Sequence, residues 1–403
     1  KIVWNELRHI MAGTTTVAGS GGYYGLVRNP DVSTMMEGLV TKNQKKVDYE
    51  TFPLGDSSNV TGLNYGNCNY PKVVTTDVLD NLIFLPHVAE GINDYAHNEL
   101  ECLSGNGNGS VNVEASNSTF IHTIAANPMD AQNIKNADMT FVWSPRSNIS
   151  LYGNTAQTVM YDNIGVRIAL STDWTPSGSI NMFRELSCAN EINSNYFNNH
   201  FTKYDLWKMV TINAARALGI DDQVGDIKEG YLADITINKI ANNDVSYFDP
   251  FISGTTQKVS LVLRGGLPMY GDTTLINSLA SDCNVLPYEQ SYSDKSVCLN
   301  EIKQKNLDFD FNDFVTVNAS SYPLTFKTND TIQDEPTCIP SRYKEYSGQR
   351  LSNDNDGDGI SNDTDNCKDV FNPIRPMDNG KQADYDNDGI GDACDPNPLK
   401  VNG

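Results

Sequence analysis

The chain has 403 residues, of which 39% are hydrophobic, so it can bury a substantial core but is too long for one ordinary compact domain; two or three domains are expected. No run of 18 apolar residues is present, which excludes the usual membrane-spanning helix. The formal net charge of −22 argues against nucleic acid as a partner, because its phosphates would be repelled.

The negative charge is concentrated near the C-terminal end of the sequence. Between Asp354 and Asp395, twelve Asp stand against Lys368, Arg375 and Lys381, a net charge of about −9. Such a segment is suited to binding cations, and a disordered acidic tail is the alternative. The regular spacing of the acidic residues, described below, favours cation binding.

Eight cysteines are present, five of them in the last third of the chain. No Cys-x-x-Cys pair occurs, which disfavours a zinc ribbon or a redox motif. The even number in a loop-rich sequence indicates disulfides and an oxidising compartment. Buried free cysteines, which are common in barrels, are the alternative.

Up to about residue 240, apolar runs end in polar residues and helical stretches follow them. Near-continuous apolar runs are typical of buried parallel strands. The later runs end about 22 to 35 residues apart, which fits one strand and one helix each and predicts a (β/α)8 barrel. The runs cover residues 14–20, 82–86, 118–121, 139–143 and 166–172, and residues 46–52 are a further strand candidate.

Later elements differ in character. Residues 205–218 have helical periodicity and are followed by Gly219, which predicts a helix end there. Residues 224–237 and 259–272 read as short strands outside the barrel. From residue 277 the sequence is irregular and rich in Asp, Asn, Ser and Cys.

Three chemically useful residues each close a separate predicted strand: His87, His122 and Asp173, with Glu90 three residues after the first. Hydrolysis or deamination at an unactivated carbon needs a nucleophile stronger than water, and a Zn²⁺-class metal lowers the pKa of bound water towards about 7. Histidine nitrogens and carboxylates are its ligands, and a nearby acid can move the protons. A lone strand-end His is usually structural, but this combination favours a metal-dependent hydrolytic site.

The sequence resembles the amidohydrolase superfamily, in its branch of deaminases and chlorohydrolases. The matching segments keep the family's order and together extend over about residues 4 to 275. The resemblance implies a TIM-type barrel with a partial β-sandwich beside it, and a metal-dependent hydrolase. The segments are residues 6–20 (ELRHIMAGTTTVAGS), 86–91 (PHVAEG), 143–153 (WSPRSNISLYG), 170–186 (LSTDWTPSGSINMFREL) and 211–237 (TINAARALGIDDQVGDIKEGYLADITI).

The resemblance also implies a role for each strand-end residue. His87 would be the metal ligand on the fifth strand, and Glu90 the acid that passes a proton to the substrate or leaving group. His122 would hydrogen-bond the metal-bound water or the developing oxyanion. Asp173, on the eighth strand, would ligate the metal and act as general base. The implied metal is Zn²⁺ or another divalent transition metal.

Further residues are expected around the substrate. Ser147 and Asn148 would shape the pocket, and Trp174 and Arg146 are candidate substrate contacts, although an Arg and a Trp at a barrel rim are as often structural. The three remaining histidines have no counterpart in the family's site and are interpreted as surface or core residues: His9, His97 and His200.

The sequence departs from the family at the first barrel strand. That strand ends in His-x-His in the family and supplies two metal ligands, but the five histidines here include no such pair. Because the chain begins with Lys1, we expect a processed or partial chain whose N-terminal strand or strands, and part of the β-sandwich, lie upstream. The prediction of a metal-dependent hydrolase therefore requires that the missing His-x-His be supplied.

Two C-terminal segments, residues 354–367 and 384–395, place Asp at alternate positions before a Gly. Alternate carboxylates on a tight loop can converge on one hard cation, and Ca²⁺ takes 6–8 oxygen ligands. Gly357 and Gly359, or Gly389 and Gly391, permit the turn. An EF-hand is disfavoured because no amphipathic helices flank the loops.

These segments are similar to thrombospondin type 3 repeats, including the DNC and GDACD motifs. The resemblance implies that Cys367 and Cys394 are half-cystines that pair with each other, and that calcium and disulfides replace an apolar core. The implied calcium ligands are Asp354, Asp356, Asp358 and Asp365 in the first segment, and Asp384, Asp386, Asp388 and Asp395 in the second.

We therefore expect a secreted protein, extracellular, periplasmic or on the cell surface. The favoured function is a metal-dependent amidohydrolase that uses metal-bound hydroxide to deaminate, or otherwise hydrolyse a C–N bond of, a cyclic or heteroaromatic small molecule. The alternative is a non-catalytic, calcium-stabilised structural or assembly protein on the same barrel, with self-association or a cell-surface partner. The expected divisions are a barrel at 1–220, accessory sandwich strands at 221–276, an irregular Cys-containing connector at 277–350 and calcium repeats at 351–403.

Overall fold

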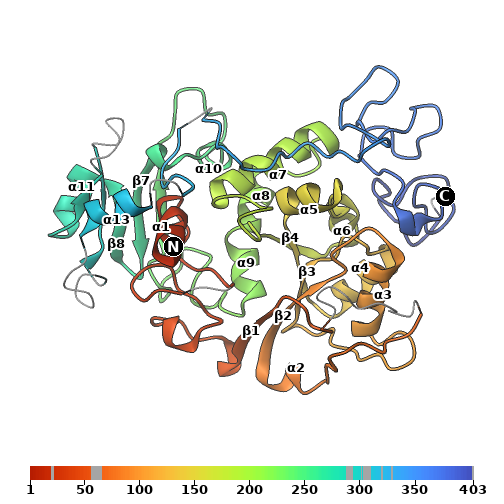
Figure 1. The fold of residues 1–403 in the computed structure, drawn as a ribbon, viewed down its shortest axis with the longest axis horizontal. Helices are drawn as coiled ribbons and strands as arrows, with labels where there is room; N and C mark the ends of the chain where they lie inside the picture. The colour runs from red at the N-terminus through yellow and green to blue at the C-terminus, as the bar shows by residue number, and fades with distance from the viewer. Residues whose placement is uncertain are drawn as a thin grey trace.

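The computed structural model describes residues 1–19, 22–55, 66–286, 294–300, 302, 310–318, 321–327 and 330–401. It contains two five-stranded sheets and a C-terminal region built mostly of loops. In Figure 1 the antiparallel sheet lies at one end of the molecule, the parallel sheet in the middle and the C-terminal region at the other end. Among the described residues, no helix is long and apolar enough to cross a membrane.

The first sheet is parallel, and its strands follow chain order from β1 to β5, so the predicted α/β class with a parallel sheet is confirmed. Helices lie between and after the strands (Figure 1). The strands are β1 (Lys46–Glu50), β2 (Leu82–Val88), β3 (Thr119–His122), β4 (Thr140–Trp143) and β5 (Arg167–Leu170). The helices are α2 (Val78–Asn81), α3 (Asp94–Leu103), α4 (Pro128–Asn136), α5 (Pro145–Tyr152), α6 (Thr158–Ile164), α7 (Met182–Tyr196), α8 (Lys203–Met209), α9 (Ile212–Ala217) and α10 (Asp249–Ile252).

Strands β2 to β5 are buried on both faces, which explains why they read as continuous apolar runs. Successive side chains of a strand point to opposite faces. Ile83 and Leu85 of β2 pack with Ile121 of β3 in one cluster, on one face of the sheet. Phe84 and Phe120 join the larger cluster on the other face, where the helices lie.

Two expected elements differ from the structure. Residues 14–20 contribute only a single bridge, between Thr16 and Arg28, in the part of that stretch that is described. The helix expected over residues 205–218 is divided into α8 and α9, because Thr211 has a non-helical backbone conformation. Within the described residues, β1 and β5 are the two edges of the sheet and do not pair with each other.

The second sheet is antiparallel, in the order β6-β7-β8-β10-β9. It shows that the expectation of an irregular connector from residue 277 is wrong in part, since β9, β10 and α13 lie there. Trp4, Tyr270, Leu299 and Phe311 pack together in its core. Strands of only two or three residues are too short for a period of two to reveal them in the sequence. The elements are β6 (Ile235–Asn238), β7 (Val259–Arg264), β8 (Leu267–Asp272), β9 (Asn284–Val285), β10 (Lys295–Val297), α1 (Ile2–Met11), α11 (Thr273–Leu279) and α13 (Phe311–Val317).

The C-terminal region, residues 330–401, contains little regular structure and packs against the helices of the parallel sheet (Figure 1). Phe371 lies edge-on to Tyr196 of α7, and its N–H donates to the carbonyl of that residue at 2.8 Å. All eight cysteines are paired, as Cys68–Cys102, Cys188–Cys338, Cys283–Cys298 and Cys367–Cys394. The short 3-10 helices of the chain are η1 (Ser33–Met35), η2 (Lys42–Gln44), η3 (Thr256–Lys258) and η5 (Pro376–Asp378).

Candidate functional site

Three predicted site residues meet at the C-terminal ends of the parallel strands. His87 lies in β2, His122 ends β3, and Asp173 follows β5. One ligand atom from each lies within 4.8 Å of the others. Nε2 of His122 is 3.9 Å from Oδ2 of Asp173 and 3.6 Å from Oε2 of Glu90. The four residues therefore share one site, although they are up to 86 positions apart in the sequence.

The backbone at this site is strained. Ala89, His122, Thr123 and Asp173 all have positive φ, at 52°, 74°, 34° and 55°. Residues other than glycine rarely adopt positive φ, and each residue that does so costs of order 1–3 kcal/mol of folding free energy. The conformation persists because neighbouring main chain fixes it, for example through the N–H of Thr123, which donates to the carbonyl of Val88 at 2.9 Å. Such strain is concentrated at functional sites.

The imidazole of His87 is oriented by the adjacent strand. Its Nδ1 lies 3.1 Å from the carbonyl oxygen of Glu50. Because a carbonyl only accepts, Nδ1 carries the proton and Nε2 presents its lone pair. Tyr49 places its hydroxyl 3.3 Å from that Nε2, with its ring edge-on to the imidazole. Metal-ligating histidines are commonly held by a hydrogen bond from the ring nitrogen that does not bind the metal, and here that bond runs from Nδ1 of His87 to Glu50.

His122 is completely buried, and burial, the largest influence, lowers its pKa to about 3, so its ring is neutral. Its Nδ1 lies 3.1 Å from Nδ2 of Asn148 on α5. Its Nε2, and Oδ1 of Asn148, have no hydrogen-bond partner among the described residues. In the orientation shown, the amide N–H donates to Nδ1, so the proton of the neutral ring lies on Nε2. With the amide turned around, its oxygen would accept from Nδ1–H and the lone pair of Nε2 would face the site.

Glu90 has the properties of a proton-transfer group. Burial, assisted by the nearby charge of Asp173, raises the pKa of Glu90 to about 7, although a hydrogen bond from Tyr152 opposes this. An acid with a pKa near the working pH is the most effective proton donor and acceptor. Tyr152 ends α5 and was not anticipated from the sequence, where nothing relates it to Glu90.

A cavity of about 240 Å³ opens beside Glu90. It is lined by Glu90, Gly91, Ile92, Asn93, Tyr95, Ala96, Glu99 and Tyr152. The expected pocket residues do not line it. Ser147 is buried beneath the site against Ser177, with their hydroxyls 2.9 Å apart, while Asn148 contacts His122 instead. Trp174 is 69% exposed and stands beside Asp173 in the sequence.

Arg146 is not a substrate contact. Its guanidinium donates to Ser179 at 2.5 Å and to the carbonyl of Pro336, and it lies 3.7 Å from Glu335. It thus ties α5 to the segment that leads into the C-terminal region. From the sequence, a strand-end Arg cannot be assigned to this role, because its partners lie about 190 residues later.

The acidic segments form two clusters. In each, three carboxylates offer oxygens within 4.8 Å of one another. The clusters are Asp354, Asp356 and Asp358, and Asp384, Asp386 and Asp388. Asp356 is 1% exposed, and its Oδ2 and that of Asp365 find no hydrogen-bond partner within the described part of the chain. Burial and then the neighbouring carboxylates raise the pKa of Asp356 to about 9. A bound cation would relieve both influences.

The loop geometry brings these carboxylates together. Asp354 accepts from the N–H groups of Gly357, at 2.7 Å, and Gly359, at 3.0 Å. Both glycines have positive φ, at 79° and 89°, which favours glycine. In the second loop Asp384 accepts from the N–H of Gly389 at 3.1 Å. Of the four glycines expected to permit the turns, Gly357, Gly359 and Gly389 have positive φ, whereas Gly391 does not.

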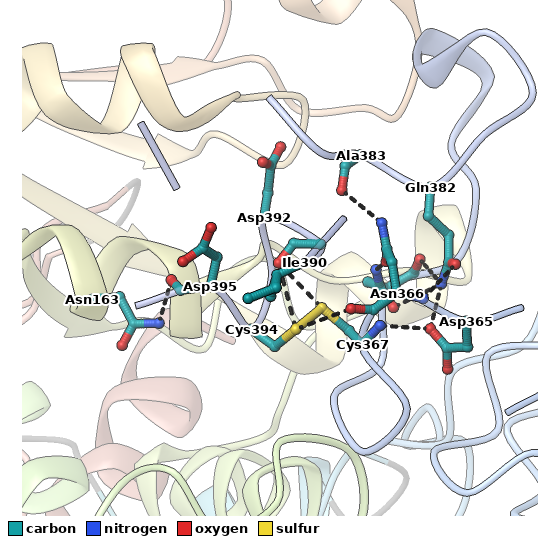
Figure 2. The surroundings of a disulfide bond; sticks show 12 residues. Asn163, Asp365, Asn366, Cys367, Gln382, Ala383, Ile390, Asp392, Cys394 and Asp395 are labelled. Carbon is teal, nitrogen blue, oxygen red and sulfur yellow. Dashed lines mark hydrogen bonds between the residues drawn. A yellow bond between two sulfur atoms is a disulfide. The ribbon is translucent and has the colours of Figure 1, made fainter. Parts of the chain in front are cut away.

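The two acidic loops are joined to each other. Cys367 and Cys394 form a disulfide, shown in Figure 2. The side-chain amide of Gln382 donates to Asp365 at 2.8 Å and to Asp358 at 3.1 Å. The carbonyl of Asp395 accepts from the side chain of Asn163 on α6 at 2.9 Å, which fixes the second loop to the barrel helices (Figure 2).

A third cluster, His97 with Glu101 and Asp130, was not anticipated. Nε2 of His97 lies 3.0 Å from Oδ2 of Asp130, which also accepts from the N–H of Asn127 at the start of α4. Asp130 is thus already engaged in capping α4, and the cluster is explained as an ion pair between α3 and α4. His200 lies 2.8 Å from Asp162, and His9 is buried in α1.

Residues 104–269 match the Amidohydrolase family. The 5-methylthioadenosine/S-adenosylhomocysteine deaminase of Thermoanaerobacter pseudethanolicus is 33% identical over 132 residues, 32% of this chain and 30% of that protein. The protein of the same name from Clostridium tetani is 25% identical over 170 residues, 40% of this chain and 39% of that protein. The chain thus spans about three to four tenths of the length of these curated relatives. Its matched part is related to the amidohydrolase superfamily, with deaminases among its homologues.

Two solved structures have a limited similarity to the chain. An adenosine deaminase from Xanthomonas campestris with bound zinc gives a TM-score of 0.42 at 18% identity, covering 50% of each chain. A triazine hydrolase variant gives a TM-score of 0.43 at 15% identity, covering 66% of this chain and 71% of that one.

Proposed function

We propose that the protein, where the His-x-His pair that this sequence lacks is supplied, is a metal-dependent hydrolase that removes an amino group from a heteroaromatic small molecule, releasing ammonia. One observation carries this proposal above the others. Nε2 of His122 is buried without a partner in the described part of the chain, and it faces ligand atoms of His87 and Asp173 within 4.8 Å. A buried ring nitrogen so placed is stabilised by a metal ion or by a hydrogen bond with a group bound there.

The residues fit a divalent transition metal such as Zn²⁺. Two imidazole nitrogens and one carboxylate are a donor set that zinc accepts, and both rings are held by a second contact, from Glu50 and from Asn148. His122 could serve as a ligand, or as the group that hydrogen-bonds water or an oxyanion at the site. When bound, the metal would supply the Lewis acidity that strengthens water as a nucleophile.

The chain's own residues supply the proton transfers. Asp173 would accept the proton of the attacking water, and Glu90 would protonate the departing nitrogen so that it leaves as ammonia. With its pKa raised to about 7, Glu90 is partly protonated at neutral pH, as this role requires. Tyr152 holds the carboxyl of Glu90 by a hydrogen bond and contributes to the wall of the cavity.

For the substrate we propose an amino-substituted purine nucleoside. The names of the relatives support this class, since those named above are deaminases of 5-methylthioadenosine and S-adenosylhomocysteine. The cavity beside Glu90 also offers two phenolic rings, from Tyr95 and Tyr152, on which a planar base can stack.

We further propose that the two acidic loops bind Ca²⁺ in the manner of thrombospondin type 3 repeats, and that the protein is secreted. The three converging carboxylates of each loop support calcium binding. Four disulfides support an oxidising compartment, because such bonds persist outside the cytosol.

The enzymatic proposal is tested by measuring ammonia release from adenosine, 5-methylthioadenosine and S-adenosylhomocysteine, with zinc supplied and calcium saturating. We expect Glu90→Gln to lower kcat by at least about 100-fold, because it removes the proton donor. His200→Ala is the matched control, since His200 pairs with Asp162 away from the site. If no substrate is turned over and the wild-type chain takes up no transition metal, the non-catalytic scaffold becomes the better reading.

A further inference from the structure

We infer that the segment of residues 366–382, which runs from the end of the first acidic loop to just before the second, positions the active-site loop that carries His122. It does so under the control of the cations bound by those loops. Arg375 is the positioning residue. The inference rests on the proposed function, because it gives the acidic loops a regulatory part in the same site.

Arg375 is buried, at 3% exposure, although it belongs to the most acidic part of the chain. Its Nη1 donates to the carbonyls of Ile124, at 3.0 Å, and Ala126, at 3.1 Å. Its remaining nitrogens donate to Asp378 at 2.9 to 3.2 Å. The charge of the guanidinium is therefore neutralised by Asp378 of η5, and its other N–H groups donate to the loop after β3.

Arg375 contacts the loop after β3, whose backbone is strained. This loop starts at His122 and Thr123, both with positive φ, and Ile124 is the next residue. A β-branched residue such as Thr123 rarely adopts this conformation, so neighbouring contacts must hold it. Two charge-assisted hydrogen bonds to the following carbonyls are contacts of that kind. Without them we expect the imidazole of His122 to lose its fixed place opposite Asp173.

The same segment touches the neighbouring active-site loop. The N–H of Met377, two residues after Arg375, lies 3.4 Å from the carbonyl of Ile92. Ile92 is two residues beyond Glu90 and lines the cavity beside it. The segment thus contacts the loops that carry both His122 and Glu90.

Both ends of the segment are fastened to the acidic loops. At one end, Cys367 is joined to Cys394 (Figure 2). There the carbonyl of Asn366 also accepts from the N–H of Gly391 at 3.0 Å. At the other end, the amide of Gln382 bridges Asp358 and Asp365. The acidic loops therefore set the position of the residues that flank Arg375.

Cation binding has a direct mechanical consequence in this arrangement. Without a cation, the carboxyl groups held within 4.8 Å lose the ion that would join them, and those that stay ionised repel one another, so the first loop is expected to open. Opening would separate Asp358 from Asp365 and release Gln382, so that the segment could shift and Arg375 could leave the carbonyls of Ile124 and Ala126. The two states would differ in contacts at the active site, as coupling between sites requires.

The test measures hydrogen exchange of the main-chain amides in residues 120–126 of the full chain, with and without saturating Ca²⁺, at constant zinc. For the wild type we expect Ca²⁺ to slow exchange of this peptide about tenfold or more, because it secures two charge-assisted hydrogen bonds to the loop. For Arg375→Ala we expect the fast, calcium-free rate at every calcium concentration. Lys381→Ala, which alters an exposed cation of the same segment, should behave as the wild type.

Further readouts separate positioning from general loss of structure. Calcium affinity of Arg375→Ala, by isothermal titration calorimetry with CaCl₂, should fall by no more than the factor by which Ca²⁺ slows exchange in the wild type, because coupling is reciprocal, and kcat should fall more than KM rises. Arg375→Lys should restore part of the protection, and it replaces Arg375→Ala if that variant does not fold. Exchange and calcium binding need no substrate, so they remain informative if the proposed reaction is wrong. The inference is overturned if the exchange rate of residues 120–126 does not change with Ca²⁺ in the wild type, or if it still changes with Ca²⁺ in Arg375→Ala.

Discussion

Nε2 of His122 and Oδ2 of Asp173 face each other at 3.9 Å across the C-terminal ends of β3 and β5, with β4 between those strands. Neither atom reaches the other by a hydrogen bond at this distance. Together with His87, these residues surround a position that suits a metal ion or other bound ligand that contacts all three of them. The geometry of this group depends on residues that hold the rings and loops, and these can be altered one at a time.

Asn148→Ala should weaken metal binding without unfolding the chain. Asn148 is the described contact of Nδ1 in His122, and loss of such a contact typically lowers metal affinity by about 10- to 100-fold. Zinc affinity by competition with a chromophoric chelator checks this. Ser150→Ala, an exposed position on the same helix, is the control and should leave the affinity unchanged. Equal affinities in both variants would show that Asn148 does not orient the ring.

Asp356→Asn should weaken calcium binding by the first acidic loop. It removes one of three converging carboxylates and a buried oxygen with no hydrogen-bond partner in the described residues. We expect at least about a tenfold rise in the calcium Kd, because ligand charge is a main determinant of affinity. Asp363→Asn, an exposed acid of the same segment, should have little effect. A calcium Kd that is the same for both variants would contradict the assigned ligand set.

Glu6→Gln should make the protein more stable at alkaline pH. Burial raises the pKa of Glu6 to about 7 from 4.5, against the hydrogen bonds from Asn29 and Tyr23. A carboxyl whose folded pKa is raised contributes stability below its unfolded pKa, and this contribution is lost as pH rises through 7. The whole effect is roughly 3 kcal/mol, from about 1.4 kcal/mol per pKa unit.

The neutral amide of Gln can still accept from the N–H of Tyr23. Urea unfolding at pH 8 should therefore show the variant more stable than wild type by up to about 3 kcal/mol, with little difference near pH 4.5. Glu229→Gln changes an exposed acid and serves as the control. A difference of the same size at both pH values would mean that the ionisation of Glu6 is not its cause.

Removing the Cys188–Cys338 disulfide should destabilise the protein by about 2–4 kcal/mol. It joins α7 to the segment before the acidic loops across a sequence separation of 150 residues, whereas Cys283–Cys298 spans 15. Since a longer loop gains more entropy in the unfolded chain, the Cys188→Ala/Cys338→Ala pair should lose more stability than the Cys283→Ala/Cys298→Ala pair. Guanidinium unfolding under non-reducing conditions compares them, and the reverse order would contradict the prediction.

The parallel sheet and the meeting of His87, His122 and Asp173 could be predicted from the sequence, because buried parallel strands leave continuous apolar runs whose ends lie at one edge. The convergence of the Asp side chains in the acidic loops could be predicted for a similar reason, since these residues and their glycines are close together in the sequence. In both cases local pattern determines the geometry.

The remaining parts depend on contacts between distant segments. Nothing near Arg375 indicates that its partners are the carbonyls after His122, about 250 residues earlier. Tyr49 and Tyr152 reach the site from neighbouring elements and leave no motif. The sequence leaves Arg146 open between a substrate contact and a structural role, and its guanidinium in fact contacts Glu335 and the carbonyl of Pro336.

The most direct test of the metal site is zinc binding by the full chain in calcium-saturated buffer, which keeps the acidic loops occupied. Equilibrium dialysis with X-ray absorption at the zinc edge should find one tightly bound zinc per chain with imidazole ligands, and His87→Ala and Asp173→Asn should each lose it while His200→Ala keeps it. A wild-type chain that binds no zinc tightly, or that binds it equally well in all of these variants, would contradict the assignment of His87, His122 and Asp173 as a metal site.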